Sequence, residues 1–323
     1  MSTPVPEETR ELLVLSQADV QRLLDLDELL DALARAFQEV SAGRTSVPPR
    51  TAARTREGFL GVMPGYLPGA GLESKLVTVF AGNHDHGLPS HQALIALFDE
   101  ETGTALALMD GTHITAVRTA AAAALSARLV ARPDSRVLAL LGAGVQGQHH
   151  LEAMRRVGEF HEIRVASRNR DHAEALASTV SCARAMTDFE QAVRGADVVC
   201  CCTDAPEPVI AYGWLRPGAH VTSVGANMAG PELDAETVRR GRLYVESRIA
   251  FSPPPAGSAE LVGLDAALAT ELGELIDGAA PGRESDEEIT VYKSMGHASE
   301  DAAAARLVYD RALREGAGRR VPI

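Results

Sequence analysis

Apolar positions in the first 43 residues recur at two different spacings. The run Glu11–Leu15 is short and apolar, which predicts a strand. Ser16 follows it and suits a helix N-cap, so we expect a helix to start there. From Leu26 to Val40 the apolar residues return every three or four positions, which predicts a second helix that ends at Gly43.

Between residues 47 and 97 the pattern changes to short runs bounded by glycine and proline turns. These runs predict an antiparallel sheet, with strands over residues 51–56, 58–64, 73–82 and 91–99. A further run over 104–110 follows a hairpin-like turn. Residues 112–131 are rich in alanine and predict a long, tightly packed helix.

After Pro133 apolar runs alternate with helical segments, which predicts a parallel, doubly wound sheet. The predicted strands are residues 137–141, 162–166, 183–185, 197–202, 220–224 and 242–245. A last strand over 288–292 and a helix over 297–314 follow, and we expect this helix to return to the first half. The predicted fold class is α/β: one domain over residues 126–297 carries the parallel sheet, and residues 1–125 with 298–323 form an α+β domain.

A glycine motif lies at the start of the parallel region. The strand over 137–141 leads into Gly142, Gly144 and Gly147, in G-x-G-x-x-G spacing, and then into a helix. Gly142 allows a sharp turn, Gly144 lets a pyrophosphate approach the backbone, and Gly147 lets the helix pack closely on the sheet. The free N–H groups of the helix N-terminus would hold the pyrophosphate. An ordinary glycine-rich turn is the alternative, but the strand and helix around the motif favour a Rossmann-type dinucleotide site.

Composition and charge narrow the class of protein. The chain is 46% hydrophobic but only 4% aromatic, so its core consists mainly of Ala, Leu and Val. Its formal net charge of -13 disfavours nucleic acid as a partner and offers no basic patch to a membrane. Three of the four cysteines, Cys200–Cys202, lie in an apolar run, where small buried side chains are expected rather than metal ligands. Without a signal peptide or an apolar run long enough to span a bilayer, we expect a cytoplasmic protein.

The end of the second parallel strand bears on the choice of dinucleotide. An NAD site usually has Asp or Glu there to bind the ribose hydroxyls, but this chain has Ser167 and Arg168. A serine hydroxyl and a guanidinium suit a 2′-phosphate, so NADP(H) is favoured and NAD(H) stays possible. In the alternative interpretation, Arg168 and Arg170 are solvated loop charges and Asp171 caps the next helix.

Three cations of the first half could bind a substrate. Arg118 is the one long polar side chain within an alanine-rich helical stretch, where a buried Arg needs a counter-anion such as a carboxylate. Arg50 and Lys75 lie at or near strand starts, and for these two alone a surface charge or an internal salt bridge is the favoured interpretation. The His84-Asp85-His86 cluster is typical of a polar turn, and we assign no metal to it.

Short motifs along the chain carry a family resemblance. They are Met63-Pro64, Lys75-Leu76-Val77, Pro89-Ser90-His91-Gln92, Met109-Asp110-Gly111, Ile114-Thr115-Ala116, Arg118-Thr119-Ala120-Ala121, the Gly142 loop, Val224-Gly225-Ala226, Glu232-Leu233 and Lys293-Ser294-Met295-Gly296. In their order and spacing the chain resembles the ornithine cyclodeaminase/mu-crystallin family, from about Arg50 to the terminal helix. The motifs are specific for the family but not for the reaction of one member.

The resemblance implies a homodimer of two-domain subunits. The first domain would bind substrate and dimerise through its own sheet, and the active site would lie between the domains, near the nicotinamide. Arg50, Lys75 and Arg118 match the residues that hold the substrate carboxylate, and Lys75 is also expected to polarise the imine or a water. The candidate cofactor-binding residues are Gly142, Gly144, Val145, Gln146, Gly147, Ser167, Arg168, Thr203, Val224 and Met295.

Two departures from the cyclodeaminase pattern bear on the reaction. A carboxylate that acts on the substrate amine is replaced by Asn227, and an acidic residue before the Met-Pro pair is replaced by Gly61. Asparagine cannot take a proton from an ammonium, but it can orient the nitrogen of an imine that arrives protonated. The chain is therefore predicted to be an NAD(P)H-dependent oxidoreductase that reduces an α-imino (cyclic ketimine) carboxylate, or a related amino-acid dehydrogenase. An ornithine or lysine cyclodeaminase that recycles NAD, and a non-enzymatic NADPH-dependent binding protein, stay open as alternatives.

Overall fold

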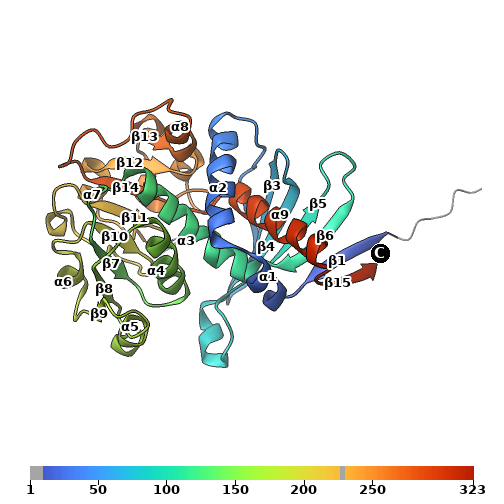
Figure 1. The fold of residues 1–323 in the computed structure, drawn as a ribbon, viewed down its shortest axis with the longest axis horizontal. Helices are drawn as coiled ribbons and strands as arrows, with labels where there is room; N and C mark the ends of the chain where they lie inside the picture. The colour runs from blue at the N-terminus through green and yellow to red at the C-terminus, as the bar shows by residue number, and fades with distance from the viewer. Residues whose placement is uncertain (1–9, 226–229) are drawn as a thin grey trace, which may run out of the picture.

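The computed structural model describes residues 10–225 and 230–323. Two β-sheets lie at opposite ends of the molecule, and the helices α2, α3 and α9 lie between them (Figure 1). One sheet has seven strands and the other has eight, so the predicted combination of a mostly antiparallel and a parallel sheet is confirmed. Among the described residues, no helix is both long and apolar enough to cross a membrane.

The seven-stranded sheet has the order β15-β1-β6-β5-β4-β3-β2. Its strands are β1 (Glu11–Leu15), β2 (Thr51–Arg54), β3 (Phe59–Leu67), β4 (Gly71–Val79), β5 (His91–Phe98), β6 (Ala105–Asp110) and β15 (Arg319–Pro322). Strands β2 to β6 form an antiparallel meander, as predicted. Strand β1 pairs in parallel with β6, and β15 pairs with β1 in antiparallel fashion.

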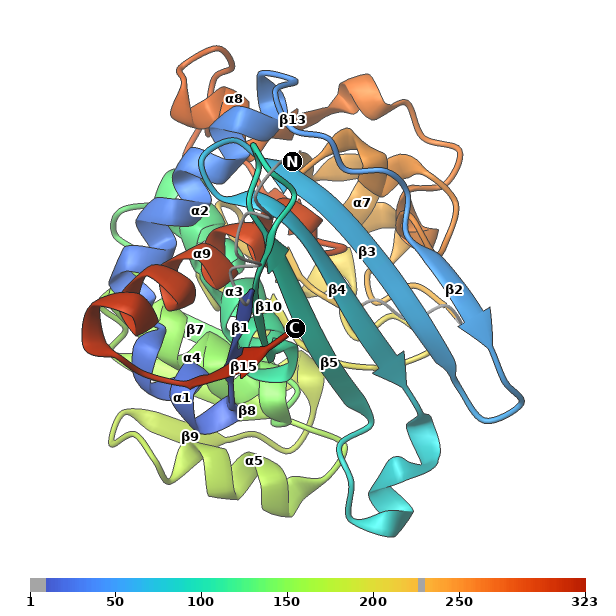
Figure 2. The ribbon, with the colours of Figure 1, turned by 90° about the vertical axis from the view of Figure 1, so that its right-hand side faces the viewer.

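Alternation along these strands separates two faces of the seven-stranded sheet. On β4, Lys75 lies between Met63 and Ile95 on the inner face, which packs against α9 (Ala298–Glu315). Neighbouring residue Leu76 points to the other face and is 38% exposed. Figure 2 shows that no helix covers this outer face over β3, β4 and β5.

The eight-stranded sheet has the order β13-β12-β14-β11-β10-β7-β8-β9, and all its neighbouring strands are parallel. Its strands are β7 (Val137–Leu141), β8 (Glu162–Ala166), β9 (Ala183–Ala185), β10 (Val198–Cys201), β11 (His220–Ser223), β12 (Arg242–Val245), β13 (Ala269–Glu271) and β14 (Thr290–Lys293). The strand order reverses direction between β7 and β10, and doubly wound sheets bind ligands at the carboxyl ends of the strands at such a point.

Helices cover both faces of the parallel sheet and the inner face of the other. They are α1 (Gln17–Leu23), α2 (Leu26–Ser41), α3 (Gly111–Val130), α4 (Val145–Val157), α5 (Arg170–Ala177), α6 (Phe189–Val193), α7 (Ala235–Arg240), α8 (Leu272–Ile276) and α9. Short 3₁₀ turns are η1 (Ala81–His86), η2 (Tyr212–Trp214), η3 (Arg248–Phe251), η4 (Ala259–Leu261) and η5 (Ala266–Leu268). Ser16 caps α1 through a capping box with Asp19, as the pattern predicted.

Helix α3 lies between the two sheets, and its small side chains let other helices pack closely on it. Residues 120–124 are all alanine and at most 1% exposed, so α2, α4 and α9 can pack closely on it. The terminal helix α9 returns to the first half and contacts α2, α3, β3, β4 and β5, as expected. The predicted domain boundary at 125/126 falls within α3, and the domain limits stay a prediction.

Candidate active site

The glycine loop has the geometry that close approach requires. Gly142 has a φ of +107°, and a Cβ atom there would lie 2.5 Å from the Cys202 carbonyl oxygen. A Cβ atom on Gly147 would lie 2.1 Å from the Gly142 carbonyl oxygen, so only glycine lets α4 pack this closely. In front of Gly144, by contrast, a Cβ atom would meet nothing within 4 Å. The loop is therefore tight towards the sheet and open on the side where a pyrophosphate would lie.

The N-terminus of α4 also fits a dinucleotide. Its N-cap is Gly144, and no side chain among residues 10–225 and 230–323 caps its first turn. Val145 is 62% exposed, and the Oε1 atom of Gln146 is buried without a hydrogen-bond partner in the described part of the chain. Free N–H groups and an unpaired amide oxygen leave polar positions for a ligand. The residues present therefore fit the cofactor predicted from the sequence.

Other candidate cofactor residues gather at the same edge of the parallel sheet. Thr203 follows β10, Val224 follows β11 and Met295 follows β14, all at carboxyl ends. Because the strands are parallel and adjacent, these residues lie along one crevice with the glycine loop. Asn227 also belongs to the predicted site, but it lies outside the described residues.

The end of β8 places Arg168 in solvent. Its Nη2 atom lies 2.7 Å from Asp204 Oδ1, and the two side chains are 69% and 86% exposed. An ion pair this exposed contributes little stability, so a ligand can replace it at small cost. Asn169, and not Asp171, caps α5, and its side chain accepts from the N–H groups of both Asp171 and His172.

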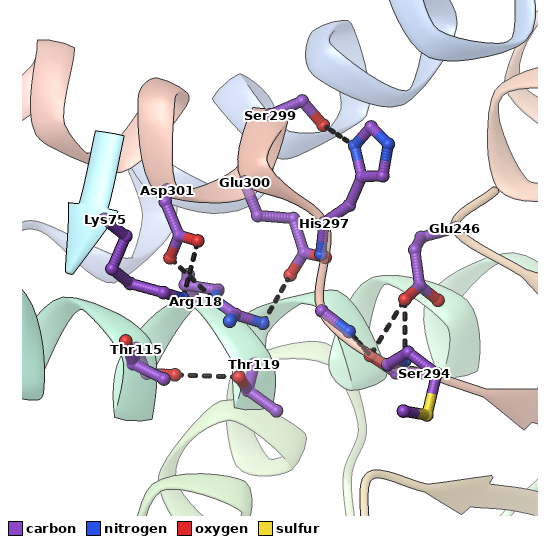
Figure 3. Close-up of polar contacts among 12 residues, drawn as sticks. Lys75, Thr115, Arg118, Thr119, Glu246, Ser294, His297, Ser299, Glu300 and Asp301 are labelled. Carbon is purple, nitrogen blue, oxygen red and sulfur yellow. Dashed lines mark hydrogen bonds and ion pairs between the residues drawn. The ribbon is translucent and has the colours of Figure 1, made fainter. Parts of the chain in front are cut away.

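The three predicted cations come together on the inner face of the seven-stranded sheet. Lys75 Nζ lies 2.6 Å from Asp301 Oδ2, and Arg118 Nε lies 3.0 Å from Asp301 Oδ1. Arg118 Nη1 also lies 3.2 Å from Glu300 Oε2 (Figure 3). Lys75 and Arg118 thus form internal salt bridges, the arrangement that was the alternative to substrate binding in the sequence analysis. Their role towards a substrate stays a prediction.

Arg50 links these groups to the parallel sheet. Its Nη2 atom donates to the carbonyl oxygens of Met295 and Gly296, at 3.0 and 2.7 Å. Burial, with a contribution from Arg118, lowers the pKa of Arg50. A small pocket opens beside it, lined by Val47, Pro48, Arg50, Met63, Pro64, Ile249, Ala256, Gly296, His297 and Ala298. We call Arg50, Lys75 and Arg118 the cation cluster.

Gly296 allows this cluster to form. Its φ is +72°, and a Cβ atom there would lie 2.6 to 3.0 Å from the guanidinium of Arg118. Any side chain would therefore push Arg118 away from α9. This glycine ends the Lys293–Gly296 motif, which the sequence singled out without indicating what it contacts.

The acidic partners of the cluster were not predicted from the sequence. Asp301 has a pKa below its ordinary value because Arg118 and Lys75 outweigh the effect of burial. Burial raises the pKa of Glu300 to about 7, against the opposing effect of Arg118. Lys75 has its pKa lowered by burial to about 8, although Asp301 opposes this. At neutral pH Glu300 is therefore partly protonated, so it attracts the Arg118 cation less strongly than Asp301 does.

A third buried carboxyl group, that of Glu73, lies near the cluster. Glu73 points to the same face of β4 as Lys75, is 3% exposed, and has no hydrogen-bond partner for either carboxyl oxygen in the described residues. Burial, and then the charge of Asp301, raises its pKa well above the ordinary value. We conclude that the folded protein holds Glu73 in its neutral form.

Glu73→Gln should therefore stabilise the protein at pH 8 and have little effect near pH 4. Above the ordinary pKa of 4.5 the unfolded carboxyl releases a proton that folded Glu73 keeps. As the pH rises, the free energy of unfolding then falls by about 1.4 kcal/mol per pH unit until the pKa of folded Glu73 is reached, and glutamine avoids this loss. Urea unfolding at both pH values measures the free energy of unfolding, with Glu159→Gln at an exposed position as the control. A Glu73→Gln effect that does not change with pH would show that folded Glu73 is charged.

The segment Glu232-Leu233-Asp234 leads into α7, as the helix-start residues in it indicate, but only Asp234 takes part in the helix, as its N-cap. Glu232 is instead 1% exposed, and its carboxylate binds the loops that follow β10 and β11. A lone Glu before an apolar residue is also typical of a helix start, so the sequence offered no signal for this role.

Comparisons with known proteins identify the family of this chain. The model of the ornithine cyclodeaminase/mu-crystallin family matches residues 10–316. The chain belongs to this family. Mouse ketimine reductase mu-crystallin is 43% identical over 305 residues, which cover 92% of this chain and 96% of the mouse protein. The family resemblance inferred from the motifs is therefore confirmed.

Two solved structures of ornithine cyclodeaminase/mu-crystallin type proteins share the whole fold. A Δ1-pyrroline-2-carboxylate reductase from Thermococcus litoralis, in complex with NADH and L-proline, is 36% identical with a TM-score of 0.90 and covers 96% of this chain and 100% of its own. An archaeal alanine dehydrogenase dimer with bound NAD is 33% identical with a TM-score of 0.89 and covers 97% and 100%. By name these relatives are reductases or dehydrogenases that act on C=N or CH–NH bonds, so the predicted reaction class is confirmed among them.

Proposed function

We propose that this chain is an NAD(P)H-dependent reductase that converts an α-imino carboxylate, such as a cyclic ketimine, to an amino acid. The observation that carries the proposal is the position of the cation cluster. The buried Lys75 and Arg118 and the partly buried Arg50 lie next to the Met295–Gly296 backbone, which follows β14 at the carboxyl edge of the parallel sheet. A carboxylate bound to the cluster would thus lie beside the nicotinamide end of a dinucleotide.

The cation cluster would bind and orient the substrate. Asp301 holds Arg118 through Nε, and no acceptor in the described residues takes a hydrogen bond from Arg118 Nη2. Glu300 has a pKa of about 7 and can take up a proton, so a substrate carboxylate can replace it at Arg118. Lys75 has two further N–H groups to direct at the imine or a water.

The remaining chemistry needs little from the protein. The bound dinucleotide supplies hydride to the imine carbon. The chain's own residues set the distance between that carbon and the cofactor, which is catalysis by positioning. We assign Asn227 to orient the imine nitrogen. At the Asn227 and Gly61 positions this chain lacks the acidic residues of the cyclodeaminase pattern, which favours reduction over cyclisation of ornithine or lysine.

The first experiment is to follow NADPH absorbance with five- and six-membered cyclic imine carboxylates, with NADH in parallel. Rapid loss of absorbance with formation of the cyclic amino acid is the expected result. Ammonia release from ornithine or lysine, without net cofactor reduction, would instead support the cyclodeaminase alternative. Tight cofactor binding without turnover of any imine would support a binding protein of mu-crystallin type and overturn the proposal.

We further propose that Arg168, assisted by Ser167, selects NADP(H) over NAD(H). The exposed Arg168 guanidinium has only an exposed partner, so it is available to a 2′-phosphate. Arg168→Asp should raise KM for NADPH by about 100-fold, since it removes a charge-assisted contact and adds a repulsive charge. The KM for NADH should change far less. Initial rates with both cofactors measure the ratio, and an unchanged ratio would disprove the assignment.

We propose a homodimer formed through the outer face of the seven-stranded sheet. Four leucines there, Leu60, Leu72, Leu76 and Leu94, are 38% to 48% exposed on neighbouring strands. An apolar face of this kind indicates an interface. Leu76→Glu should give a monomer in light scattering coupled to size exclusion, whereas Leu268→Glu, at a leucine outside this face that is 64% exposed, should stay dimeric. A dimeric Leu76→Glu protein would exclude this face.

A further inference from the structure

Glu232 joins two loops at the carboxyl edge of the parallel sheet. Its Oε1 atom accepts from the N–H and the hydroxyl of Thr203, both at 2.7 Å. Its Oε2 atom accepts from the Ser223 hydroxyl at 2.7 Å and the Gly225 N–H at 2.8 Å. All four contacts are donated to Glu232, so the carboxylate acts only as an acceptor. One buried side chain thus sets the spacing between the loops after β10 and β11.

Gly225 is shaped to receive this carboxylate. A Cβ atom on Gly225 would lie 2.7 Å from Glu232 Oε2 and 2.9 Å from the Thr203 carbonyl oxygen. The absence of a side chain lets the two loops and the carboxylate approach one another. The glycine of the Val224-Gly225 motif therefore permits the contact with Glu232, in addition to any contact with a ligand.

Lys293 holds the same loop from the other side. Its Nζ atom donates to the Ser223 hydroxyl at 3.0 Å and to the Gly225 carbonyl oxygen at 2.7 Å. It also lies 3.2 Å from Glu260 Oε1, which accepts from the Glu232 N–H at 2.7 Å. The network is buried, and each polar group in it has a partner, so it resists rearrangement.

The sheet order shows which half of a dinucleotide lies over these loops. The pyrophosphate loop follows β7, and Arg168, our candidate for the adenosine phosphate, follows β8 on one side of it. Thr203 and Gly225 follow β10 and β11 on the other side. In a doubly wound sheet the dinucleotide crosses this point, so the nicotinamide half lies over β10 and β11.

We propose that Glu232 is a positioning residue for the nicotinamide half of the cofactor, an inference that rests on the proposed function. Through Thr203 and Gly225 it fixes the floor on which the nicotinamide ribose and ring lie. It contacts neither the substrate nor the adenosine half. Glu232→Gln keeps the shape of the side chain but places an amide NH₂ against the N–H of either Gly225 or Thr203, so one of these two contacts is lost and its loop moves.

The test compares a whole dinucleotide with its adenosine half. We expect Glu232→Gln to raise the Kd of NADPH, measured by calorimetry, at least 10-fold and to leave the Kd of 2′-phospho-ADP-ribose within twofold. Arg168→Asp should weaken both ligands. Exposed Glu236→Gln, on α7, is the matched control and should change neither. At saturating NADPH, Glu232→Gln should also lower kcat, because the ring is misplaced.

Loss of affinity for both ligands in Glu232→Gln, or for neither, would overturn the inference. If that variant does not fold, Thr203→Val removes one of the four bonds to Glu232 and should show a smaller effect of the same selectivity. A wild-type protein that binds no nicotinamide dinucleotide would overturn the proposed function as well. Binding with unchanged Kd values in the variants would overturn only the role of Glu232.

Discussion

Arg118→Met should lower kcat/KM for the imino carboxylate by about 10³-fold, since two charge-assisted hydrogen bonds contribute about 1.5–3 kcal/mol each. The guanidinium is 4% exposed, and Asp301 holds it at 3.0 Å, so it is already oriented before a substrate arrives. Steady-state kinetics over a range of imine concentrations measure the loss. The Kd of NADPH should stay unchanged, because Arg118 is held by Asp301 and Glu300 on α9 and not at the glycine loop where the cofactor is expected.

The same substitution also affects stability, and a matched variant separates the two effects. Removing Arg118 leaves the buried Glu300 without its cation, which costs about 3–5 kcal/mol when a buried pair is broken. The double variant Arg118→Met/Glu300→Gln removes the unpaired charge and should recover much of the stability but none of the activity. Arg118→Lys should retain stability better and lose activity through the missing fork of donors. Near-normal turnover by Arg118→Met would exclude Arg118 from carboxylate binding.

The second large effect concerns Lys75 and pH. Burial lowers the pKa of Lys75 to about 8, so its positive charge is present below pH 8 and lost above it. Relative to Lys75→Arg, which keeps its charge, we expect the wild-type kcat/KM to stay level up to about pH 8 and then to fall about tenfold per pH unit. Lys75→Met should lie about 10²-fold below wild type under pH 8, and this difference should shrink above pH 8 because wild-type Lys75 is then neutral.

Comparing these variants with one imine removes the titration of the substrate itself from the result. The ionisation of the imine affects wild type and Lys75→Arg equally, so only a difference between their profiles reports on Lys75. If the two profiles coincide, the positive charge of Lys75 has no part in the step that kcat/KM measures. The Kd of NADPH, measured at the same pH values, identifies any effect on cofactor binding.

Local patterns predicted most of the fold. Helix periodicity between Leu26 and Val40, the alternating runs up to residue 99, and the β–α alternation after Pro133 each depend on neighbours within a few residues. The short strands β13 and β15 were missed, because three or four residues carry too little pattern to predict a strand. The parallel pairing of β1 with β6 joins distant segments and was not predictable from either one.

The residues of the site also divide into those that local sequence patterns predicted and those that they did not. The glycine loop could be found from the sequence because strand, turn and helix are consecutive, and each glycine acts on atoms close by. Arg118 could be singled out because a long charged side chain in an alanine-rich helix is unusual, whereas Arg50 and Lys75 were assigned to the site only through the family motifs. The partners of these cations could not be found from the sequence, because Lys75 and Asp301 are separated by 226 residues along the chain, and Arg118 and Glu300 by 182. Glu232 resembled the start of a helix, and only the folded chain shows it between two loops.

Spacing along the chain thus predicted the fold class, the position of the dinucleotide loop and the unusual position of Arg118, while the family motifs added Arg50 and Lys75. Only the folded chain shows which carboxylates face those cations, that Glu73 is buried with no partner among the described residues, and that Glu232 joins two strand ends. The reason is physical. Buried charges and carboxyl groups take their partners and their pKa values from whatever the fold places against them, and those groups come from distant parts of the chain.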